Sequence, residues 1–385
     1  MLRNARIVLR DRVVERGALL IDAGQITRIV TGESRSQGGS LESDLAGLTI
    51  FPGFIDLHIH GAVGVDTMAA TATDLDRVSK FLATRGVTGW LPTLVPAPQA
   101  DYARAIVAID EAMALTGGAK ILGVHYEGPF VNSAQCGALH AQFFRSFSGA
   151  RDLDDLPELE GAAKHVMTVA PEIDGGVELV RELTCRGWIV SLGHTRADFD
   201  LLDQACAAGA RHMTHFMNAM TPLHHRSPGP VGWGLARDEV TCDFIADGIH
   251  LDRQMLQLLL KLKSADRLSL ISDAVTAAGL GDGNYEIWGE TITVKDGRTS
   301  NARGTIAGSV ITMLDAGRLM LSLGASEVEV AKMAATNPAR LLGIDQDCGS
   351  IEEGKQADLV ALDADRNVVF TMIGGAIVFD SRKSS

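Results

Sequence analysis

The chain has 385 residues, of which 46% are hydrophobic and 22% charged, values that exclude global disorder and allow a packed core. Its 35 Lys and Arg against 48 Asp and Glu give a net charge of −13, so nucleic acid and anionic membranes are poor generic partners. The chain contains no run of 18 apolar residues, and its 5 cysteines are widely spaced without a CxxC pair. We therefore expect a cytoplasmic protein with free thiols.

Both ends of the chain consist of short apolar segments separated by turn residues, a pattern typical of β structure. These predicted β segments are residues 5–9, 17–22, 25–30, 349–351, 357–362 and 368–379. The dipeptides Ala23-Gly24 and Gly374-Gly375 are expected breaks between strands.

Between the two ends, β-rich apolar segments alternate with helical patterns, which is typical of βα units. The predicted strands are residues 50–58, 87–95, 120–127, 166–170, 188–194, 211–216, 241–246 and 267–272. The predicted helices include residues 72–85, 99–115, 176–186, 199–208 and 253–263. Strands and helices that alternate in this way over about 290 residues predict a (β/α)8 barrel, whose active site lies at the C-terminal ends of the strands.

The first predicted barrel strand carries a pair of imidazoles at its C-terminal end. Because side chains alternate across a strand, His58 and His60 share one face with Phe54 and Asp56, while the intervening apolar residues face the helices. The spacing of two residues lets both rings reach one cation. The strand therefore predicts a metal site inside the barrel mouth.

Four further polar residues follow later strands at the same end of the barrel. Glu127 ends the third strand before a Gly-Pro turn, where a carboxylate can bridge two cations. His194 follows the fifth strand, His215 the sixth and Asp273 the eighth. Because these strand ends meet at one rim, the residues together predict a metal centre. His125, two residues before Glu127, is interpreted as a partner of a ligand rather than a ligand.

This constellation resembles the amidohydrolase superfamily, and the whole chain is similar to one family within it, the N-acetylglucosamine-6-phosphate deacetylases. The resemblance is carried by Glu127-Gly128-Pro129-Phe130, Leu192-Gly193-His194-Thr195, Thr214-His215-Phe216-Met217-Asn218-Ala219-Met220, Asp247-Gly248-Ile249-His250, Ser272-Asp273-Ala274 and Ile306-Ala307-Gly308-Ser309. Most other amidohydrolases use a carboxylated Lys on strand four, and residues 166–171 contain no Lys.

The resemblance implies a fold of class α/β: a (β/α)8 TIM-type barrel with a small β-sandwich domain built from both chain ends. The expected boundaries are residues 1–50 and 345–385 for the β-sandwich and 51–344 for the metal-dependent hydrolase barrel. The implied reaction is hydrolysis of the acetamide of N-acetylglucosamine 6-phosphate to glucosamine 6-phosphate and acetate.

The resemblance also implies roles for the residues at the barrel mouth. Glu127, His194 and His215 would hold a primary divalent metal, and His58 and His60 would hold a second, with Glu127 as the bridge. Asp273 would take the proton from the attacking water, pass it to the leaving nitrogen, and also touch the second metal. One or two metals per subunit are expected, with zinc or iron as the best matches to His and carboxylate donors.

A stretch of 34 residues, from 204 to 237, contains no Asp or Glu in this acidic chain, and it follows the sixth strand. Within it, Arg226 lies in a loop bounded by Pro and Gly and can give a phosphate two charge-assisted hydrogen bonds. The family resemblance assigns a phosphate-binding Arg to this position. In the family this Arg can come from a partner subunit, so we expect a homodimer.

The remaining substrate contacts are implied by the resemblance. His250 would bind the sugar or phosphate, and Asn218 and the backbone amide of Ala219 would also contact the substrate. Residues 306–308 form a further substrate loop, and the glycine there permits close backbone approach. The expected substrate-binding residues are Ala138, Leu139, His140, Asn218, Ala219, Arg226, His250, Ile306, Ala307 and Gly308.

One segment departs from the family pattern. Family members place a His that holds the acetyl group directly after a Gly-x pair, whereas here Leu139 is inserted before His140.

The open alternatives are N-acetylgalactosamine 6-phosphate as substrate, an amidohydrolase for another N-acyl compound or a cyclic amide, and a metal-binding relative without catalysis. The last is disfavoured because no ligand position is missing from the sequence.

Overall fold

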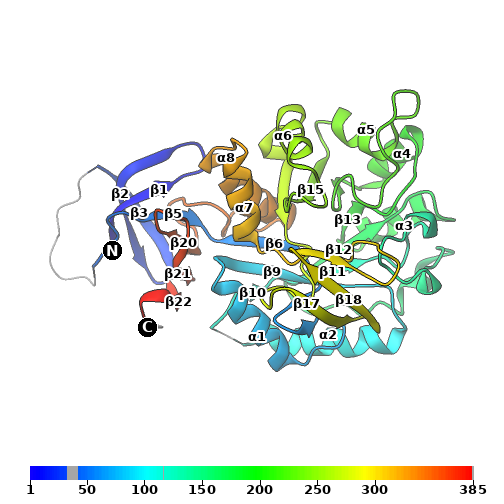
Figure 1. Cartoon of the computed structure of the whole chain (residues 1–385), viewed down its shortest axis with the longest axis horizontal. Helices are drawn as coiled ribbons and strands as arrows, with labels where there is room; N and C mark the ends of the chain where they lie inside the picture. Colours follow the sequence, from blue (N-terminus) through cyan, green and yellow to red (C-terminus); the bar gives the residue numbers. More distant parts are fainter. Residues whose placement is uncertain (33–41, 116, 384–385) are drawn as a thin grey trace.

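The computed structural model describes residues 1–32, 42–115 and 117–383. Figure 1 shows two parts: a barrel surrounded by helices, and a smaller β domain in which the blue N-terminal and red C-terminal segments lie side by side. The predicted fold class is confirmed, because the central strands form a parallel barrel and both chain ends form the second domain. The exact domain boundaries stay a prediction.

The barrel is built from parallel strands in sequence order, with the first paired to the second and so on around the sheet. These strands are β6 (Phe54–Ile59), β9 (Val87–Leu94), β11 (Gly123–Glu127), β12 (Lys164–Val169), β13 (Ile189–Leu192), β14 (His212–Met213), β15 (Thr241–Ile245) and β16 (Leu268–Ile271). A short strand, β10 (Lys120–Ile121), also pairs with β9. A parallel bridge between Ile59 and Ala274 joins the last strand to the first, so the strand ends converge on one rim.

Helices pack around the barrel between its strands (Figure 1). They are α1 (Ala72–Ala83), α2 (Gln99–Met113), α3 (Gly176–Cys185), α4 (Phe199–Ala208), α5 (Gly229–Ala236), α6 (Arg253–Leu262), α7 (Met313–Ser322), α8 (Glu327–Ala331) and α9 (Asn337–Leu341). A capping box begins α1: Thr71 accepts from the Asp74 backbone N–H, and the Asp74 carboxylate accepts from Thr71. Within the described residues, no helix is long and apolar enough to cross a membrane.

The smaller domain is one continuous sheet with its own hydrophobic core. Its strands are β1 (Leu2–Val8), β2 (Val13–Asp22), β3 (Gln25–Thr31), β4 (Ser43–Asp44), β5 (Thr49–Pro52), β20 (Leu359–Leu362), β21 (Val368–Ile373) and β22 (Ala376–Asp380). Ile26 near one edge and Phe370 near the other are buried in the same core, so the sheet folds over itself. The prediction of β structure at residues 349–351 is wrong, because these residues form no strand and lead into the sheet through bends.

A three-stranded antiparallel hairpin sheet was not among the predicted elements. It comprises β17 (Gly283–Ile287), β18 (Glu290–Lys295) and β19 (Arg298–Ser300), inserted after the last barrel strand. A two-stranded ribbon, β7 (Gly61–Ala62) and β8 (Val65–Asp66), follows the first barrel strand. Both insertions therefore lie at the end of the barrel where the polar residues gather.

Candidate active site

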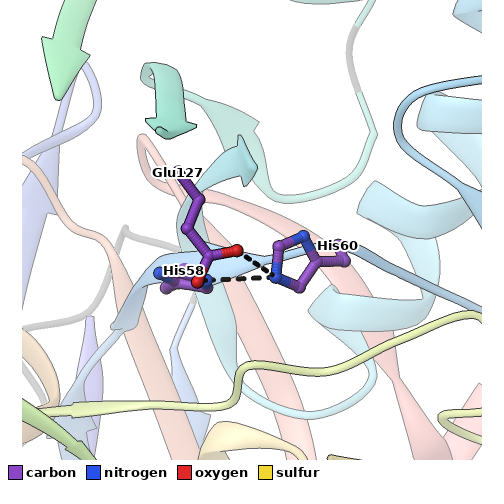
Figure 2. Close-up of side chains that lie close together, drawn as sticks. All are labelled: His58, His60 and Glu127. Atoms are coloured by element: carbon purple, nitrogen blue, oxygen red, sulfur yellow. Dashed lines mark hydrogen bonds and ion pairs between the residues drawn. The ribbon is translucent and has the colours of Figure 1, made fainter. Parts of the chain in front are cut away.

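The first barrel strand brings both imidazoles into the barrel, although irregular pairing with β9 interrupts the regular alternation along it. His58 and His60 are buried, and their Nε2 atoms lie 3.1 Å apart. Ile55 and Leu57 of the same strand belong to an apolar cluster with Leu91, Val166 and Ile245 of other barrel strands, whereas Phe54 and Ile59 belong to the main core. Figure 2 shows both rings turned toward the carboxylate of Glu127, which comes from the end of β11.

Glu127 joins two groups of imidazoles. Its Oε1 lies 2.9 Å from His194 Nε2 and 3.0 Å from His215 Nε2. Its Oε2 lies 3.4 Å from His60 Nε2, and its Oε1 lies 3.7 Å from His58 Nε2. The residues thus form two clusters that share Glu127, each compact enough to hold one metal ion.

The donor chemistry of both clusters fits a divalent transition metal. Imidazole nitrogens and carboxylate oxygens are the ligands that such ions prefer. His194 and His215 bring their Nε2 atoms within 3.1 Å, as do His58 and His60. Two neutral imidazole nitrogens that face each other can share only one hydrogen, so a cation between the donors satisfies the lone pairs better than the protein alone.

Hydrogen bonds from neighbouring residues hold the His194 ring and the His215 backbone, whereas the Nδ1 atoms of His58, His60 and His215 have no partner among the described residues. The Nδ1 of His194 donates to the backbone carbonyl of Gln135 at 2.7 Å, which leaves its Nε2 free to bind a metal. The carboxylate of Asp243 on β15 accepts from the His215 backbone N–H and lies 2.9 Å from His212 Nε2. His125 contacts the Leu57 carbonyl and Thr168 through its two nitrogens, and its ring lies edge-on to that of His58, with 4.6 Å between the ring centroids.

Asp273 lies opposite Glu127 across the imidazoles of the first strand. Its Oδ1 is 3.2 Å from His60 Nε2 and 3.5 Å from His58 Nε2. The backbone of Asp273 donates to the His58 carbonyl at 2.9 Å and accepts from Ser309 at 2.7 Å. A Cβ at Gly308 would approach the Asp273 carbonyl to 2.8 Å, so only glycine fits this position.

Backbone strain is concentrated at the same place. His194, His215 and Asp273 have φ values of 47°, 31° and 49°, in the left-handed region that side chains other than glycine rarely adopt. Such conformations persist where the surrounding structure forces them, and they cluster at functional sites. The turn after each strand thereby directs a side chain back over the barrel axis.

The electrostatics of the centre are dominated by one carboxylate. Burial opposes ionisation of Glu127, but the surrounding imidazoles hold its pKa well below its usual range. Burial disfavours the charged form of His215, but Glu127 overcomes this effect and raises the pKa of His215 to about 9. Burial lowers the pKa of His58 well below its usual value. The centre therefore combines the buried, ionised carboxylate of Glu127 with imidazoles that can bind a cation beside it.

A cavity of about 250 Å³ opens above this centre. Ala138, Leu139, Asn218, Ala219, His250, Ile306 and Gly308 line it, together with most of the expected metal ligands and Asp273. His58 lies beneath the cavity, and Ala307 is buried behind its wall.

Two expected substrate contacts lie away from the cavity. His140 lines a neighbouring cavity and lies 3.5 Å from the carboxylate of Glu290. Arg226 is exposed, and its guanidinium donates to the neighbouring His225 ring at 2.8 Å. Leu139, directly before His140, lines the catalytic cavity.

Three residues of the site were not foreseen from the sequence. Gln135 and Asp243 orient ligands, and Trp288, at the tip of the β17–β18 hairpin, lines the cavity. Asp243 carries a detectable signal, because it is an acid within the apolar strand of residues 241–246. The contribution of Gln135 comes from a backbone carbonyl, for which no side-chain pattern exists.

A buried cluster of imidazoles and carboxylates at the C-terminal mouth of a (β/α)8 barrel defines the class of metal-dependent hydrolases. A profile of the amidohydrolase family matches residues 49–378. The chain is 36% identical to the N-acetylglucosamine-6-phosphate deacetylase of Bacillus subtilis (strain 168), over 100% of this chain and 98% of that protein. It is 37% identical to the N-acetylgalactosamine-6-phosphate deacetylase of Escherichia coli O157:H7, over 85% of this chain and 86% of that protein.

A solved structure shows the same architecture. A mutant N-acetyl-D-glucosamine-6-phosphate deacetylase from Mycobacterium smegmatis, in complex with N-acetyl-D-glucosamine-6-phosphate, superimposes with a TM-score of 0.89 at 31% identity. The match covers 98% of both chains. The chain belongs to the amidohydrolase family, in the group of N-acetylglucosamine-6-phosphate deacetylases.

Proposed function

We propose that the protein hydrolyses the acetamide of N-acetylglucosamine 6-phosphate to glucosamine 6-phosphate and acetate. The observation that carries this proposal is the placement of Glu127, His194 and His215 opposite Asp273, at the floor of one cavity. The relatives that share the whole length of the chain are named for this reaction.

The first role is to hold the divalent metal. Glu127, His194 and His215 would form the primary site, and His58 and His60 the second, with Glu127 common to both. A bound cation of this kind, zinc or iron, makes water more acidic and the amide carbonyl more electrophilic. Glu127 Oε1 faces His194 and His215 while Oε2 faces His60, which supports a bridging role.

Asp273 is the proposed general base and acid. It takes a proton from the water that attacks the acetyl carbon, and then gives that proton to the nitrogen as the C–N bond breaks. The new C–O bond leaves acetate, and the sugar leaves as the amine. Its backbone is fixed on both sides by His58 and Ser309, so the carboxylate is held at the reacting atoms without reorganisation.

The sugar is bound by residues from the later strands. The side-chain amide nitrogen of Asn218 is buried, with no hydrogen-bond partner in the described part of the chain, so a sugar oxygen can satisfy it. Asp247 lies 2.7 Å from His250 Nδ1 and thereby orients that ring. Both Asn218 and His250 line the cavity, and they follow the sixth and seventh barrel strands.

Arg226 is proposed to bind the phosphate of a substrate held by a second copy of the chain. The side chain lies outside its own cavity, and the loop of residues 222–227 is exposed, with Leu223 at 56%. A homodimer would bury this loop and bring Arg226 to the partner's cavity. Arg226 does not line the cavity of its own chain, and this observation supports the arrangement.

Metal removal tests the proposed chemistry. We expect purified protein to contain one or two divalent ions per chain by elemental analysis, and a chelator to abolish acetate release. Adding back zinc or iron should restore it. Full activity in metal-free protein would refute the proposed role of the histidine clusters.

A further inference from the structure

The tip of the β17–β18 hairpin holds a tryptophan in an unfavourable backbone conformation. Ile287 pairs with Glu290, so Trp288 and Gly289 are the two central residues of the turn. Their φ values are 51° and 78°, both in the left-handed region that such two-residue turns require. Glycine and asparagine adopt this conformation easily, whereas a bulky side chain does not. The strain at Trp288 indicates that the indole serves a purpose at this position.

The indole of Trp288 packs against the metal centre. Its ring lies edge-on to the ring of His60, with 5.0 Å between the ring centroids. Trp288 and Leu139 line the catalytic cavity, and both also line a second cavity of about 320 Å³. These two side chains therefore form the wall between the cavities.

The second cavity is suited to an apolar chain. It is lined mainly by apolar side chains, among them Met68, Val95, Pro96 and Phe143. Four polar residues also belong to its lining: Asp66, Asp101, Arg104 and His140. It lies beyond the ends of the first three barrel strands, whereas Asn218 and His250 follow the sixth and seventh.

The orientation of the bound substrate in the catalytic cavity follows from the proposed function, on which this inference rests. The amide carbon must lie at the imidazoles and Asp273, and the sugar must extend toward Asn218 and His250. The acyl group then points to the remaining part of the lining, which includes Leu139 and Trp288.

We propose that Trp288, together with Leu139, restricts the enzyme to the acetyl group by closing off the second cavity. Without this wall, the second cavity would receive a longer acyl chain of about four carbons. Trp288 is a specificity-determining residue in this proposal, and it takes no part in proton transfer.

The test compares two substrates and measures their kcat/KM ratio. N-butanoylglucosamine 6-phosphate and N-acetylglucosamine 6-phosphate differ by two methylenes, and amine release is measured for both. In Trp288→Gly, the turn keeps a residue that favours positive φ, so the hairpin is expected to form. The butanoyl-to-acetyl ratio should rise by at least about tenfold over the native chain, a typical effect of relieving a steric block in a substrate pocket. Leu139→Ala should shift the ratio in the same direction.

Two controls separate the wall from the hairpin itself. Trp288→Phe retains an aromatic wall, and its ratio should stay near the native value. Asp296 and Gly297 form the sister turn between β18 and β19, with φ values of 52° and 74°. Asp296→Gly removes a side chain from an equivalent turn that lines neither cavity, and it should leave the ratio unchanged.

A binding measurement covers the case in which Trp288→Gly lowers turnover of both substrates. In an Asp273→Asn background, calorimetry should show that Trp288→Gly tightens binding of the butanoyl substrate by at least about tenfold relative to the acetyl substrate. An unchanged preference in binding and in kcat/KM would overturn the proposal. Failure of the native chain to cleave the acetyl substrate would instead overturn the proposed function.

Discussion

The buried metal centre and the exposed loop of residues 222–227 are two polar regions at the same end of the barrel, and they are held in opposite ways. His58 is 0% exposed and Glu127 and His215 are each 4% exposed, whereas Leu223 in the loop is 56% exposed. Donors in the centre come directly from strand ends and contact one another across the barrel. In the loop, the hydrogen bonds join near neighbours, such as Arg226 to His225 and Ser227 to His224.

This difference indicates where each region completes its structure. The barrel positions the metal ligands within a single chain, because strand pairing sets the distance between one strand end and the next. The loop has no such frame, and its proposed role requires a partner subunit or a bound phosphate. Changes in the centre should therefore affect catalysis and metal binding, and changes in the loop should affect substrate binding alone.

Replacement of the shared carboxylate should have the largest effect. Glu127→Gln removes the negative charge that both histidine clusters use, so metal content should fall and acetate release should drop by at least about 10⁴-fold. Elemental analysis and a kinetic assay measure the two quantities. The matched control is Glu290→Gln, which changes a carboxylate on the hairpin outside the catalytic cavity. Native metal content with native turnover in Glu127→Gln would remove this residue from the centre.

Loss of the proposed base should separate chemistry from metal binding. Asp273→Asn should keep most of the bound metal and lower kcat by about 10²- to 10⁴-fold, the usual contribution of general acid–base catalysis. Asp282→Asn, at an exposed acid before the hairpin, is the control and should behave as the native chain. Near-native turnover in Asp273→Asn would contradict the assignment of proton transfer to this residue.

Replacement of Asp243, which contacts the His215 backbone and His212, should have a smaller effect on the same centre. Asp243→Asn weakens the hold on the His215 backbone and on His212, so metal affinity should fall by about 10- to 100-fold. Removal of one member of this buried pair should also destabilise the fold, which a thermal melt of the variant would record. A variant with native metal affinity and native stability would show that the strand ends alone fix the ligands.

A change in the loop should have the smallest effect, limited to the substrate's phosphate. Arg226→Ala should raise KM for N-acetylglucosamine 6-phosphate by about tenfold or more and leave KM for the unphosphorylated sugar nearly unchanged. Arg211→Ala is the matched control, because Arg211 donates to the Ala210 and Cys206 carbonyls on the helix side. Equal effects of Arg226→Ala on both sugars would exclude a contact with phosphate.

The clustering of the imidazoles and carboxylates was predictable from the sequence because each of these side chains is placed by its own strand. His58 and His60 could be placed by alternation, and each later ligand follows an apolar strand that ends at the same rim. The predicted helix of residues 199–208 matches α4 for the same reason, since Asp198 caps its start and Gly209 ends it.

The rest depended on contacts that the sequence does not display. The turn of Trp288 and Gly289 lacks the Asn-Gly signal of a hairpin, so the sheet of residues 283–300 and its wall beside His60 escaped prediction. The position of Arg226 outside its own cavity likewise depends on how the loop of residues 222–227 folds. The alternation of side chains along a strand predicts neither the hairpin sheet nor the position of Arg226.

The most direct test of the account is an acetate-release assay with four sugars. These are N-acetylglucosamine 6-phosphate, N-acetylgalactosamine 6-phosphate and the two corresponding sugars without phosphate. We predict that N-acetylglucosamine 6-phosphate gives the highest kcat/KM and that each unphosphorylated sugar is a much poorer substrate. The absence of acetate release from all four sugars, with metal bound, would contradict the account.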